Sequence, residues 1–465
     1  MQLDKDLQAR QEARDLAKQA ELAQQALFGF SQTQLDEITR AVAKAFEGVA
    51  EELAGMAVKE TGFGNVKDKT VKNQFASRSV LEAIAPMKTV GVLKEEAGLW
   101  EVGVPVGVIA AIVPSTNPTS TVCYKAMIAL KSGNAIVFSP HPKALGCTLR
   151  ASRIVAEAAE RAGAPKGCVS CLTIPSLDGC RELMSANEVK LILATGGPAM
   201  VKAAYSSGKP AIGVGAGNGP AYLHPSCDLK EALEKILRSK TFDNGTVCAS
   251  EQSIIVERHM ERMAEETAKS MGYYFMNDNE AKALGAILFR PNGALNPDIV
   301  GKSPQVLAEK AGFTAPGGTK ILVARQQDAG AKYPYSHEKL CPVLAWFVSD
   351  NEEAAKKLAI KILHNEGAGH TFSIHAKDPE AVRRFCLDIP VSRFMVNAPS
   401  AQGGIGAETR LFPALTLGCG AVGGSSSSEN ISPMHLVNIR KVAWGQTKED
   451  TLVEILTAKI LERLK

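Results

Sequence analysis

The stretch KLILATGGPAMVKAAYSSGKPAIGVGAGNGP, residues 190–220, decides the class of fold. It begins as an apolar run, turns at Gly196–Gly197 and continues with Pro198 at the first position of an expected helix. A strand, a tight glycine turn and a helix in this order are typical of a parallel sheet covered by helices. The N–H groups at the start of such a helix suit a pyrophosphate, although the same turn also occurs for purely structural reasons.

The same alternation continues on both sides of this stretch. Upstream, strand-like runs at 99–114 and 134–140 are separated by a helical segment, and the chain before them is helical in pattern. Downstream, the strand-like SIIVE (253–257) precedes a helical run at 259–272, and further strands and helices alternate after it. We therefore predict an α/β protein with two α/β units and a boundary near residue 220.

Composition describes an ordinary globular chain without a strongly charged face. Of 465 residues, 45% are hydrophobic and 22% are charged, and the formal net charge is only +4. The basic residues are scattered along the chain, which argues against nucleic acid as a partner. No apolar run reaches the roughly 18 residues needed to span a bilayer, so we expect no membrane segment.

The ten cysteines indicate a reducing compartment rather than disulfides or zinc. The N-terminal segment is charged and helical in pattern, unlike a signal peptide, so we expect reduced thiols in the cytoplasm. Cys168 and Cys171 form a CxxC pair, but no second pair or histidine cluster completes a metal site. We expect no metal, and a structural role for this pair.

Two polar turns could carry chemistry. Cys248 lies among small and polar residues in FDNGTVCASEQS (242–253), which suits an accessible thiol, although most free cysteines are simply buried. Asn117 lies between two prolines in PSTNPTS (114–120), where its amide could donate to an oxyanion or could serve only the turn. The residues alone leave these alternatives open.

Six segments, taken in order, resemble the CoA-acylating branch of the aldehyde dehydrogenase superfamily. The resemblance is closest to the aldehyde dehydrogenase half of bifunctional aldehyde–alcohol dehydrogenases, runs from about residue 10 to 445, and implies the aldehyde half alone. The six segments are IVPSTNPTST (112–121), the stretch 192–220, KTFDNGTVCASEQS (240–253), HEKLCPVLA (337–345), AQGGIG (401–406) and LTLGCGAVGG (415–424).

The resemblance assigns catalytic roles residue by residue. Cys248 would be the nucleophile that attacks the aldehyde carbonyl, and Asn117 with the Cys248 backbone N–H would form the oxyanion hole. Glu338 would hold the ribose next to the nicotinamide, and His370 would assist the attack of CoA. Family members that release a free acid carry a glutamate where this chain has Val214. Without that base, a thioester on Cys248 should persist until a thiol displaces it.

The implied cofactor is NAD, with coenzyme A as the co-substrate. Besides Glu338, the residues that the resemblance places against NAD are Ser139, Pro140, His141, Gly196, Gly197 and Gly215. We expect NAD rather than NADP because VFSPHP (137–142) contains no obvious partner for a 2′-phosphate, although His141 and Lys143 keep NADP as an alternative.

The implied reaction is the reversible conversion of a small aldehyde, CoA and NAD to acyl-CoA and NADH through a cysteine thioester. Closeness to the bifunctional enzymes favours acetaldehyde as the substrate. The alternatives are propionaldehyde or sulfoacetaldehyde as substrate, a hydrolytic enzyme that forms the free acid, and a structural protein with an inactive site.

The implied architecture is the aldehyde dehydrogenase fold. It would have a Rossmann-like cofactor domain in 1–220, interrupted by flap strands near 91–107, and an α/β catalytic domain in 221–430. A strand in 431–446 would complete a small β-flap for oligomerisation, which implies a homodimer or a higher oligomer. Residues 447–465 have the pattern of an amphipathic helix, which would either pack on the protein itself or contact the shell or cargo of a bacterial microcompartment.

Overall fold

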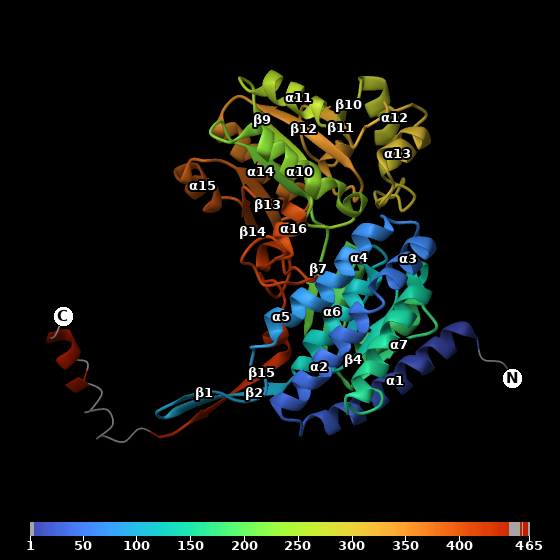
Figure 1. The fold of residues 1–465 in the computed structure, drawn as a ribbon, viewed down its shortest axis with the longest axis vertical. Helices are drawn as coiled ribbons and strands as arrows, with labels where there is room; N and C mark the ends of the chain where they lie inside the picture. Colours follow the sequence, from blue (N-terminus) through green and yellow to red (C-terminus); the bar gives the residue numbers. More distant parts are fainter. Residues whose placement is uncertain (1–3, 446–455, 458, 464–465) are drawn as a thin grey trace.

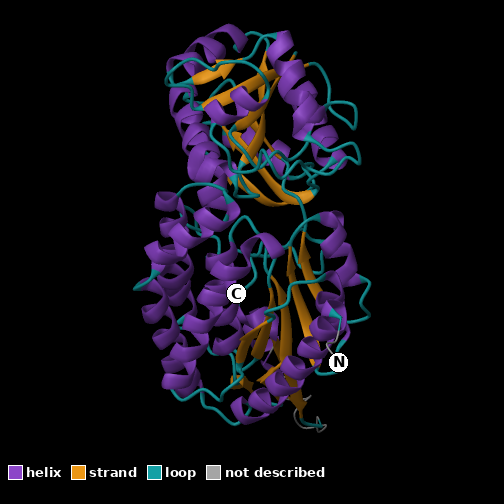
Figure 2. Cartoon of the chain, turned by 90° about the vertical axis from the view of Figure 1, so that its right-hand side faces the viewer, coloured by secondary structure: helices purple, strands orange, loops and turns teal. Residues whose placement is uncertain are grey.

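The computed structural model describes residues 4–445, 456–457 and 459–463, and the strands in this part of the chain form three sheets. Figure 1 shows two of the sheets in separate lobes and the third as a narrow ribbon that projects from the lower lobe. Both lobes combine strands with covering helices, as Figure 2 shows from the side. The α/β class predicted from the sequence is confirmed.

The lower lobe contains a five-stranded parallel sheet in the order β5–β4–β3–β6–β7. Its strands are β3 (Val108–Ile112), β4 (Ala135–Ser139), β5 (Val169–Cys171), β6 (Val189–Thr195) and β7 (Ala211–Val214). Every residue of β3, β4 and β7 is buried, as expected where helices cover both faces of a parallel sheet. The chain winds outward from β3 to β5 and then returns past β3 to β6, which is the strand order of a nucleotide-binding sheet.

Helices surround this sheet, and the most deeply placed is α6 (Pro118–Lys131), all of whose residues are buried. Pro118 occupies its first position, so the helix begins directly after Asn117. The other helices of the lobe are α1 (Lys5–Leu27), α2 (Gln32–Glu47), α3 (Ala50–Thr61), α4 (Val66–Gln74), the π-helical turn η1 (Phe75–Ser79), α5 (Val80–Ile84), α7 (Leu145–Arg161), α8 (Leu177–Ser185) and α9 (Pro198–Tyr205).

The upper lobe contains a seven-stranded parallel sheet in the order β10–β11–β12–β9–β8–β13–β14. The strands are β8 (Gly219–Leu223), β9 (Glu251–Glu257), β10 (Tyr273–Phe275), β11 (Ile321–Gln326), β12 (Val343–Ser349), β13 (Gly369–His375) and β14 (Val391–Val396). The helices are α10 (Leu229–Thr241), α11 (Glu261–Ser270), α12 (Asp278–Leu288), α13 (Pro304–Lys310), α14 (Glu352–Asn365), α15 (Pro379–Cys386) and α16 (Ser400–Gly404).

The third sheet is the narrow antiparallel flap β1–β2–β15. Its strands are β1 (Gly91–Glu96), β2 (Leu99–Pro105) and β15 (Val437–Ala443), close to the flap segments expected from the sequence. Trp100 packs edge-on against Trp444 with ring centroids 4.9 Å apart. Leu99 and Ile439 are exposed, so this single chain leaves apolar surface of the flap uncovered.

The two lobes do not divide the chain at a single point. The first sheet ends at Val214 and the second begins at Gly219, just before the predicted boundary near residue 220. After β14 the chain returns to the lower lobe, where Leu417 and Ile431 join the same apolar core as Phe46. The last part of the catalytic domain predicted at 221–430 therefore packs in the lower lobe and not with the second sheet.

Most of the C-terminal helix expected at 447–465 lies outside the described residues. Residues 456–457 and 459–463 are helical, and Leu456, Ile460 and Leu461 are exposed there. None of the helices described is both long and apolar enough to cross a bilayer.

Candidate active site between the two sheets

The residues singled out from the sequence gather where the two large sheets meet. At the carboxyl edge of the first sheet, Asn117 follows β3, Gly196–Gly197 follow β6, and Gly215 follows β7. At the amino edge of the second sheet, Cys248 precedes β9 and Glu338 precedes β12. The crevice outside the carboxyl ends of a parallel sheet is the usual place for a ligand in such folds.

The Asn117 amide lies beside the loop that carries Cys248. Its Nδ2 donates to the carbonyl of Thr246 at 3.3 Å, two residues before Cys248, and its Oδ1 accepts from Lys72 Nζ at 2.6 Å. Because an ammonium group can only donate, the amide oxygen must face Lys72 and the NH₂ group must face away from it. The two residues that the resemblance joins are thus neighbours in space.

The loop before Cys248 takes an uncommon backbone path. Asp243, Asn244 and Gly245 have φ values of 49°, 51° and 76°, which only short polar residues and glycine adopt readily. The Asp243 carboxylate accepts from Lys72 at 2.5 Å and from Lys69 at 2.9 Å. Burial alone would raise the pKa of Asp243, but the two ammonium groups outweigh it and hold this pKa below its ordinary value.

Cys248 itself is half-buried, which differs from the accessible thiol expected from its polar neighbours. Its side chain packs against the core of the lower lobe. Burial, followed by the charge of Glu338, raises the pKa of the Cys248 thiol to about 12, although Arg393 and Lys72 act in the opposite direction. The thiol is therefore protonated at neutral pH, and the surrounding core rather than the local sequence decides this.

Gly217 joins three of the predicted site residues. Its N–H donates to Glu338 Oε1 at 2.9 Å. A Cβ built on it would lie 2.0 Å from the carbonyl oxygen of Cys248 and 3.1 Å from Cε1 of His370. Only a glycine allows the β7–β8 connection to pass at this point, and its presence brings Cys248, Glu338 and His370 together.

Glu338 lies near two buried lysines, Lys240 and Lys339, and the half-buried Glu366. Burial and then the neighbouring Glu366 carboxylate raise the pKa of Glu338 to about 8, while Lys240 and Lys339 lower it. The Glu338 backbone N–H donates to Glu366 Oε2 at 2.6 Å. Glu338 is therefore largely protonated at pH 7.

His370 is fully buried at the start of β13. Its Nδ1 lies 2.8 Å from Thr371 Oγ1, whereas Nε2 has no hydrogen-bond partner among the described residues. Burial, and then the charge of Arg393, lower the pKa of His370 to about 3, so the ring is neutral. The Nε2 atom of His370 is thus both buried and, within the described part of the chain, unpaired.

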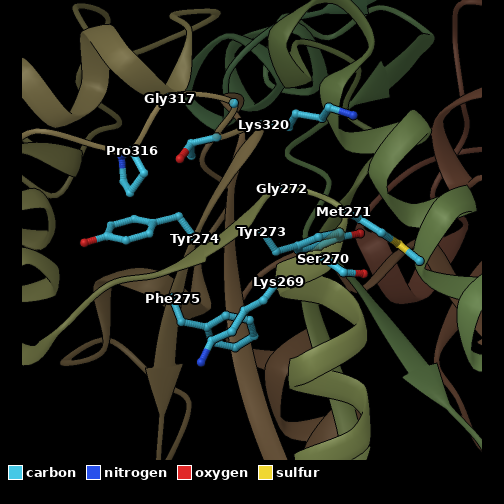
Figure 3. A pocket seen from close by; sticks show the side chains of 12 residues that line it. Lys269, Ser270, Met271, Gly272, Tyr273, Tyr274, Phe275, Pro316, Gly317 and Lys320 are labelled. Carbon is cyan, nitrogen blue, oxygen red and sulfur yellow. The ribbon is translucent and has the colours of Figure 1, made fainter.

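A cavity of about 570 Å³ opens between the lobes beside these residues. Pro198 and Gly215 line it from the lower lobe, and Glu366, Cys419 and Gly423 line it from the opposite side. A second cavity, of about 660 Å³, lies at β10 on the outer edge of the second sheet and is lined by side chains such as Lys269 and Tyr274 (Figure 3). Two strands, β11 and β12, lie between β10 and β9, so this outer cavity is not part of the site at Cys248.

The remaining predicted cofactor residues lie along the same edge of the first sheet. Ser139 and Pro140 are buried at the end of β4, and His141 is exposed just beyond them. Gly197 precedes α9 without a side-chain cap. Because Pro198 has no N–H and the Met200 N–H donates to the Gly197 carbonyl at 3.0 Å, the Ala199 N–H is the group left open to an anion in the first turn. These positions fit a dinucleotide laid across the carboxyl ends of β4 and β6.

Val214 ends β7 as a buried aliphatic side chain with 3% exposure. It therefore offers no carboxylate to activate water at the end of β7, where the hydrolytic relatives were expected to carry their base.

Comparison with known proteins gives the family. The sequence pattern of the Aldehyde dehydrogenase family matches residues 5–289. The chain belongs to the aldehyde dehydrogenase family. It is also 36% identical to the succinate-semialdehyde dehydrogenase (acetylating) of Clostridium kluyveri, over 93% of this chain and 95% of that protein.

Further relatives place this aldehyde dehydrogenase near acylating enzymes. It is 44% identical to the bifunctional aldehyde-alcohol dehydrogenase AdhE of Escherichia coli K12 over 92% of this chain but only 49% of that protein, so it spans about half the length of that relative. The crystal structure of an acetylating aldehyde dehydrogenase from Geobacillus thermoglucosidasius matches with a TM-score of 0.94 and 48% identity, covering 96% of this chain and 99% of that one.

Two features of this aldehyde dehydrogenase escaped the sequence motifs. Lys69 and Lys72 lie three residues apart on α4 and reach Asp243 from the far side of the Cys248 loop. Their spacing on one helix face is visible in the sequence, but nothing links it to a loop more than 170 residues later. Such a pairing is fixed by tertiary packing alone.

Arg393 on β14 is the other feature. It is 2% exposed, its Nη2 donates to the Gly418 carbonyl at 2.6 Å, and it forms no ion pair among the described residues. It thereby anchors the glycine-rich loop that presents Cys419 to the cavity, and its charge acts on Cys248 as well.

Proposed function

We propose that this protein is a CoA-acylating aldehyde dehydrogenase that converts a small aldehyde, CoA and NAD reversibly to acyl-CoA and NADH. Two observations support the proposal: the Asn117 amide donates to the Thr246 carbonyl, two residues before Cys248, and the strand β7 ends at the aliphatic Val214. The names of the acetylating relatives support the same chemistry.

In this proposal Cys248 carries the acyl group. Its thiol gives up its proton to water and Sγ adds to the aldehyde carbon, and the Asn117 amide together with the Cys248 backbone N–H holds the resulting oxyanion. NAD, when bound, would supply the hydride acceptor needed to oxidise this adduct to an acyl thioester. The thiol of CoA then displaces the acyl group and regenerates Cys248. Because Val214 provides no general base, water competes poorly in this last step.

We assign the cofactor site to the carboxyl edge of the first sheet. The open N-terminus of α9 at Gly197 would receive the pyrophosphate, and the Ser139–Pro140–His141 turn would contact the adenosine ribose. Glu338 would bind the second ribose, after exchanging its present hydrogen bond with Gly217. The unpaired Nε2 of His370 would accept a hydrogen bond from the thiol of CoA. It would not take up the proton itself, because a pKa of about 3 makes the His370 ring a weak base.

We propose acetaldehyde as the physiological aldehyde. The buried cations that act on Cys248 are both engaged, Lys72 with Asp243 and Arg393 with backbone carbonyls. Neither is left to bind a sulfonate or a carboxylate on the substrate, which favours an uncharged aldehyde. Propionaldehyde is the second candidate, because a propionaldehyde dehydrogenase from Clostridium phytofermentans has the same fold with a TM-score of 0.83 and 28% identity.

The test is NADH formation from NAD and acetaldehyde with and without CoA. The same assay with propionaldehyde, sulfoacetaldehyde and succinate semialdehyde ranks the substrates. We expect sustained turnover only with CoA, and the fastest turnover with acetaldehyde. Equal turnover without CoA would mean that water deacylates Cys248, and the acylating function would be wrong.

We further propose a cytoplasmic homodimer or higher oligomer that forms through the flap. The exposed Leu99 and Ile439 and the unpaired edges of β1 and β15 support this, because one chain alone leaves them open to solvent. Light scattering of the intact protein and of an Ile439→Lys variant tests it. A monomeric wild-type protein would contradict the proposal.

A contact between the C-terminal helix and a microcompartment shell is a separate proposal. The exposure of Leu456, Ile460 and Leu461 supports an unpartnered apolar stripe, and the propionaldehyde dehydrogenase above is named for a microcompartment. Removal of residues 447–465 should abolish co-localisation with shell proteins while leaving turnover intact. Unchanged co-localisation would end this proposal.

A further inference from the structure

The ammonium group of Lys72 holds the Asn117 amide in a single orientation. We propose that Lys72 is a positioning residue of this enzyme, which fixes Asn117 so that its N–H donors, and never its oxygen, are presented to the oxyanion at Cys248. The proposal deepens the function proposed above and rests on it.

Each proton of the Lys72 ammonium group has an acceptor. Nζ lies 2.6 Å from Asn117 Oδ1, 2.5 Å from Asp243 Oδ2 and 3.0 Å from Thr246 Oγ1. The side chain is 3% exposed, so water does not compete for these positions. An ammonium group has three donors and no acceptor. The three contacts therefore use every donor of Lys72 and fix the direction of its Nζ, and one of them binds the Asn117 side-chain oxygen.

The other end of the amide is held much more loosely. Nδ2 of Asn117 lies 3.3 Å from Thr116 Oγ1 and 3.3 Å from the Thr246 carbonyl, both longer than the usual 2.9–3.0 Å. The two N–H donors can therefore turn to a developing oxyanion at small cost, while the tightly bound oxygen keeps the group from flipping. A donor oriented before the reaction is what electrostatic stabilisation of an oxyanion requires.

Without Lys72 the amide would lose this preference. Its two ends are alike in size, and a half-turn would place the oxygen where the oxyanion forms, which repels the charge instead of stabilising it. The loss should therefore appear in the chemical step and depend on the presence of the Asn117 amide.

Lys69 provides a control within the same network. It is as deeply buried as Lys72, with 3% exposure, and it pairs with the same Asp243 oxygen at 2.9 Å. Its other hydrogen bond goes to the Thr116 carbonyl at 2.7 Å rather than to the Asn117 amide. Lys69→Met thus removes a comparable buried charge next to Asp243 without releasing Asn117.

The experiment is a pair of double-mutant cycles on the full chain, read as kcat for NADH formation with saturating aldehyde, NAD and CoA. One cycle combines Lys72→Met with Asn117→Ala, and the other combines Lys69→Met with Asn117→Ala. We expect Asn117→Ala and Lys72→Met each to lower kcat by about one to two orders of magnitude, and the double variant to lose no more than about twofold beyond Asn117→Ala. The effects of Lys69→Met and Asn117→Ala should multiply.

The outcomes separate this proposal from the function on which it rests. If the losses of Lys72→Met and Asn117→Ala multiply, Lys72 does not act through the amide and the proposal is overturned, while the large effect of Asn117→Ala keeps the proposed function. If Asn117→Ala lowers kcat by less than about threefold, the amide is not the oxyanion donor. The proposed role of Lys72 and the proposed function are then both wrong. Thermal unfolding and NADH binding by fluorescence check that the variants are folded.

Lys72→Arg supplies a second cycle should Lys72→Met not fold. It keeps a positive charge beside Asp243, but a planar guanidinium cannot reproduce three donors spread around one nitrogen. We expect a smaller loss of kcat that again disappears in the Asn117→Ala background. A loss that persists in that background would overturn the proposal.

Discussion

The α-carbon of Gly217 lies directly against the carbonyl oxygen of Cys248. A methyl group added there would stand 2.0 Å from that oxygen and 3.1 Å from the His370 ring. The same residue binds Glu338 through its N–H. One glycine therefore fixes the distances among the three groups that the proposed reaction uses, and a side chain at this point must move at least one of them.

Gly217→Ala should consequently lower both stability and turnover. The two nearest neighbours of the new methyl group are backbone atoms of Cys248, which cannot yield as a flexible side chain would, so we expect a loss of about 1–3 kcal/mol in the free energy of unfolding. Urea unfolding and kcat measure the two effects. Gly215→Ala is the matched control for stability, because a Cβ on Gly215 has no atom within 4 Å. Equal stabilities of the two variants would contradict this geometry.

The class of fold was predictable from sequence because strands and helices alternate with glycine turns, and this local pattern sets a parallel sheet. The state of Cys248 was not predictable from its neighbours. Its small polar flanks indicate exposure, whereas the half-buried position and raised pKa arise from packing against the lower lobe and from Glu338, 90 residues later.

The positions of Asn117 and Glu338 followed from motifs, but the groups that orient them did not. Lys72, Asp243 and Gly217 act through contacts between segments far apart in the chain. A single sequence contains no signal for such contacts, since each residue looks ordinary in its own segment. The chain's return to the lower lobe after β14 was missed for the same reason.

Replacement of Cys248 should remove turnover without removing the binding of NADH. Cys248→Ser lacks the thiolate that carries the acyl group, and we expect a fall in kcat of at least about a thousandfold. Stopped-flow NADH formation and fluorescence titration of NADH measure the two properties. Cys386→Ser is the control, because that thiol is exposed on α15 and should leave kcat unchanged. Near-normal turnover of Cys248→Ser would exclude the thioester mechanism.

Asp243→Asn should destabilise the fold and change its response to acid. The variant leaves Lys69 and Lys72 as buried charges without a counter-ion, which costs about 3–5 kcal/mol. The pKa of Asp243 lies below its ordinary value in the folded protein, so its contribution to stability is present at neutral pH and is lost as the pH falls through that lowered pKa.

Urea unfolding between pH 3 and 7 measures this difference between wild type and Asp243→Asn. The gap in stability should narrow toward the acid end. Asp350→Asn removes an exposed ion pair with Arg258 and should change stability by less than about 1 kcal/mol at every pH. A constant gap across the range would show that folding does not lower the pKa of Asp243.

Glu338→Gln should make Cys248 more reactive, but only in alkaline solution. Glu338 has a pKa of about 8 in the folded protein, so below that pH it is neutral and resembles glutamine. Above it, the carboxylate opposes formation of the Cys248 thiolate. The rate of alkylation by iodoacetamide, followed at the Cys248 peptide by mass spectrometry, should therefore agree at pH 7 and be about three- to tenfold faster in Glu338→Gln at pH 9.

Glu366→Gln is the informative control for this profile. The Glu366 carboxylate helps to raise the pKa of Glu338, so its removal should let Glu338 ionise earlier and slow alkylation of Cys248 from a lower pH than in the wild type. The two variants should thus shift the profile in opposite directions. Parallel profiles for wild type and Glu338→Gln up to pH 9 would mean that the Glu338 charge does not affect the pKa of Cys248, and that burial alone keeps the thiol protonated.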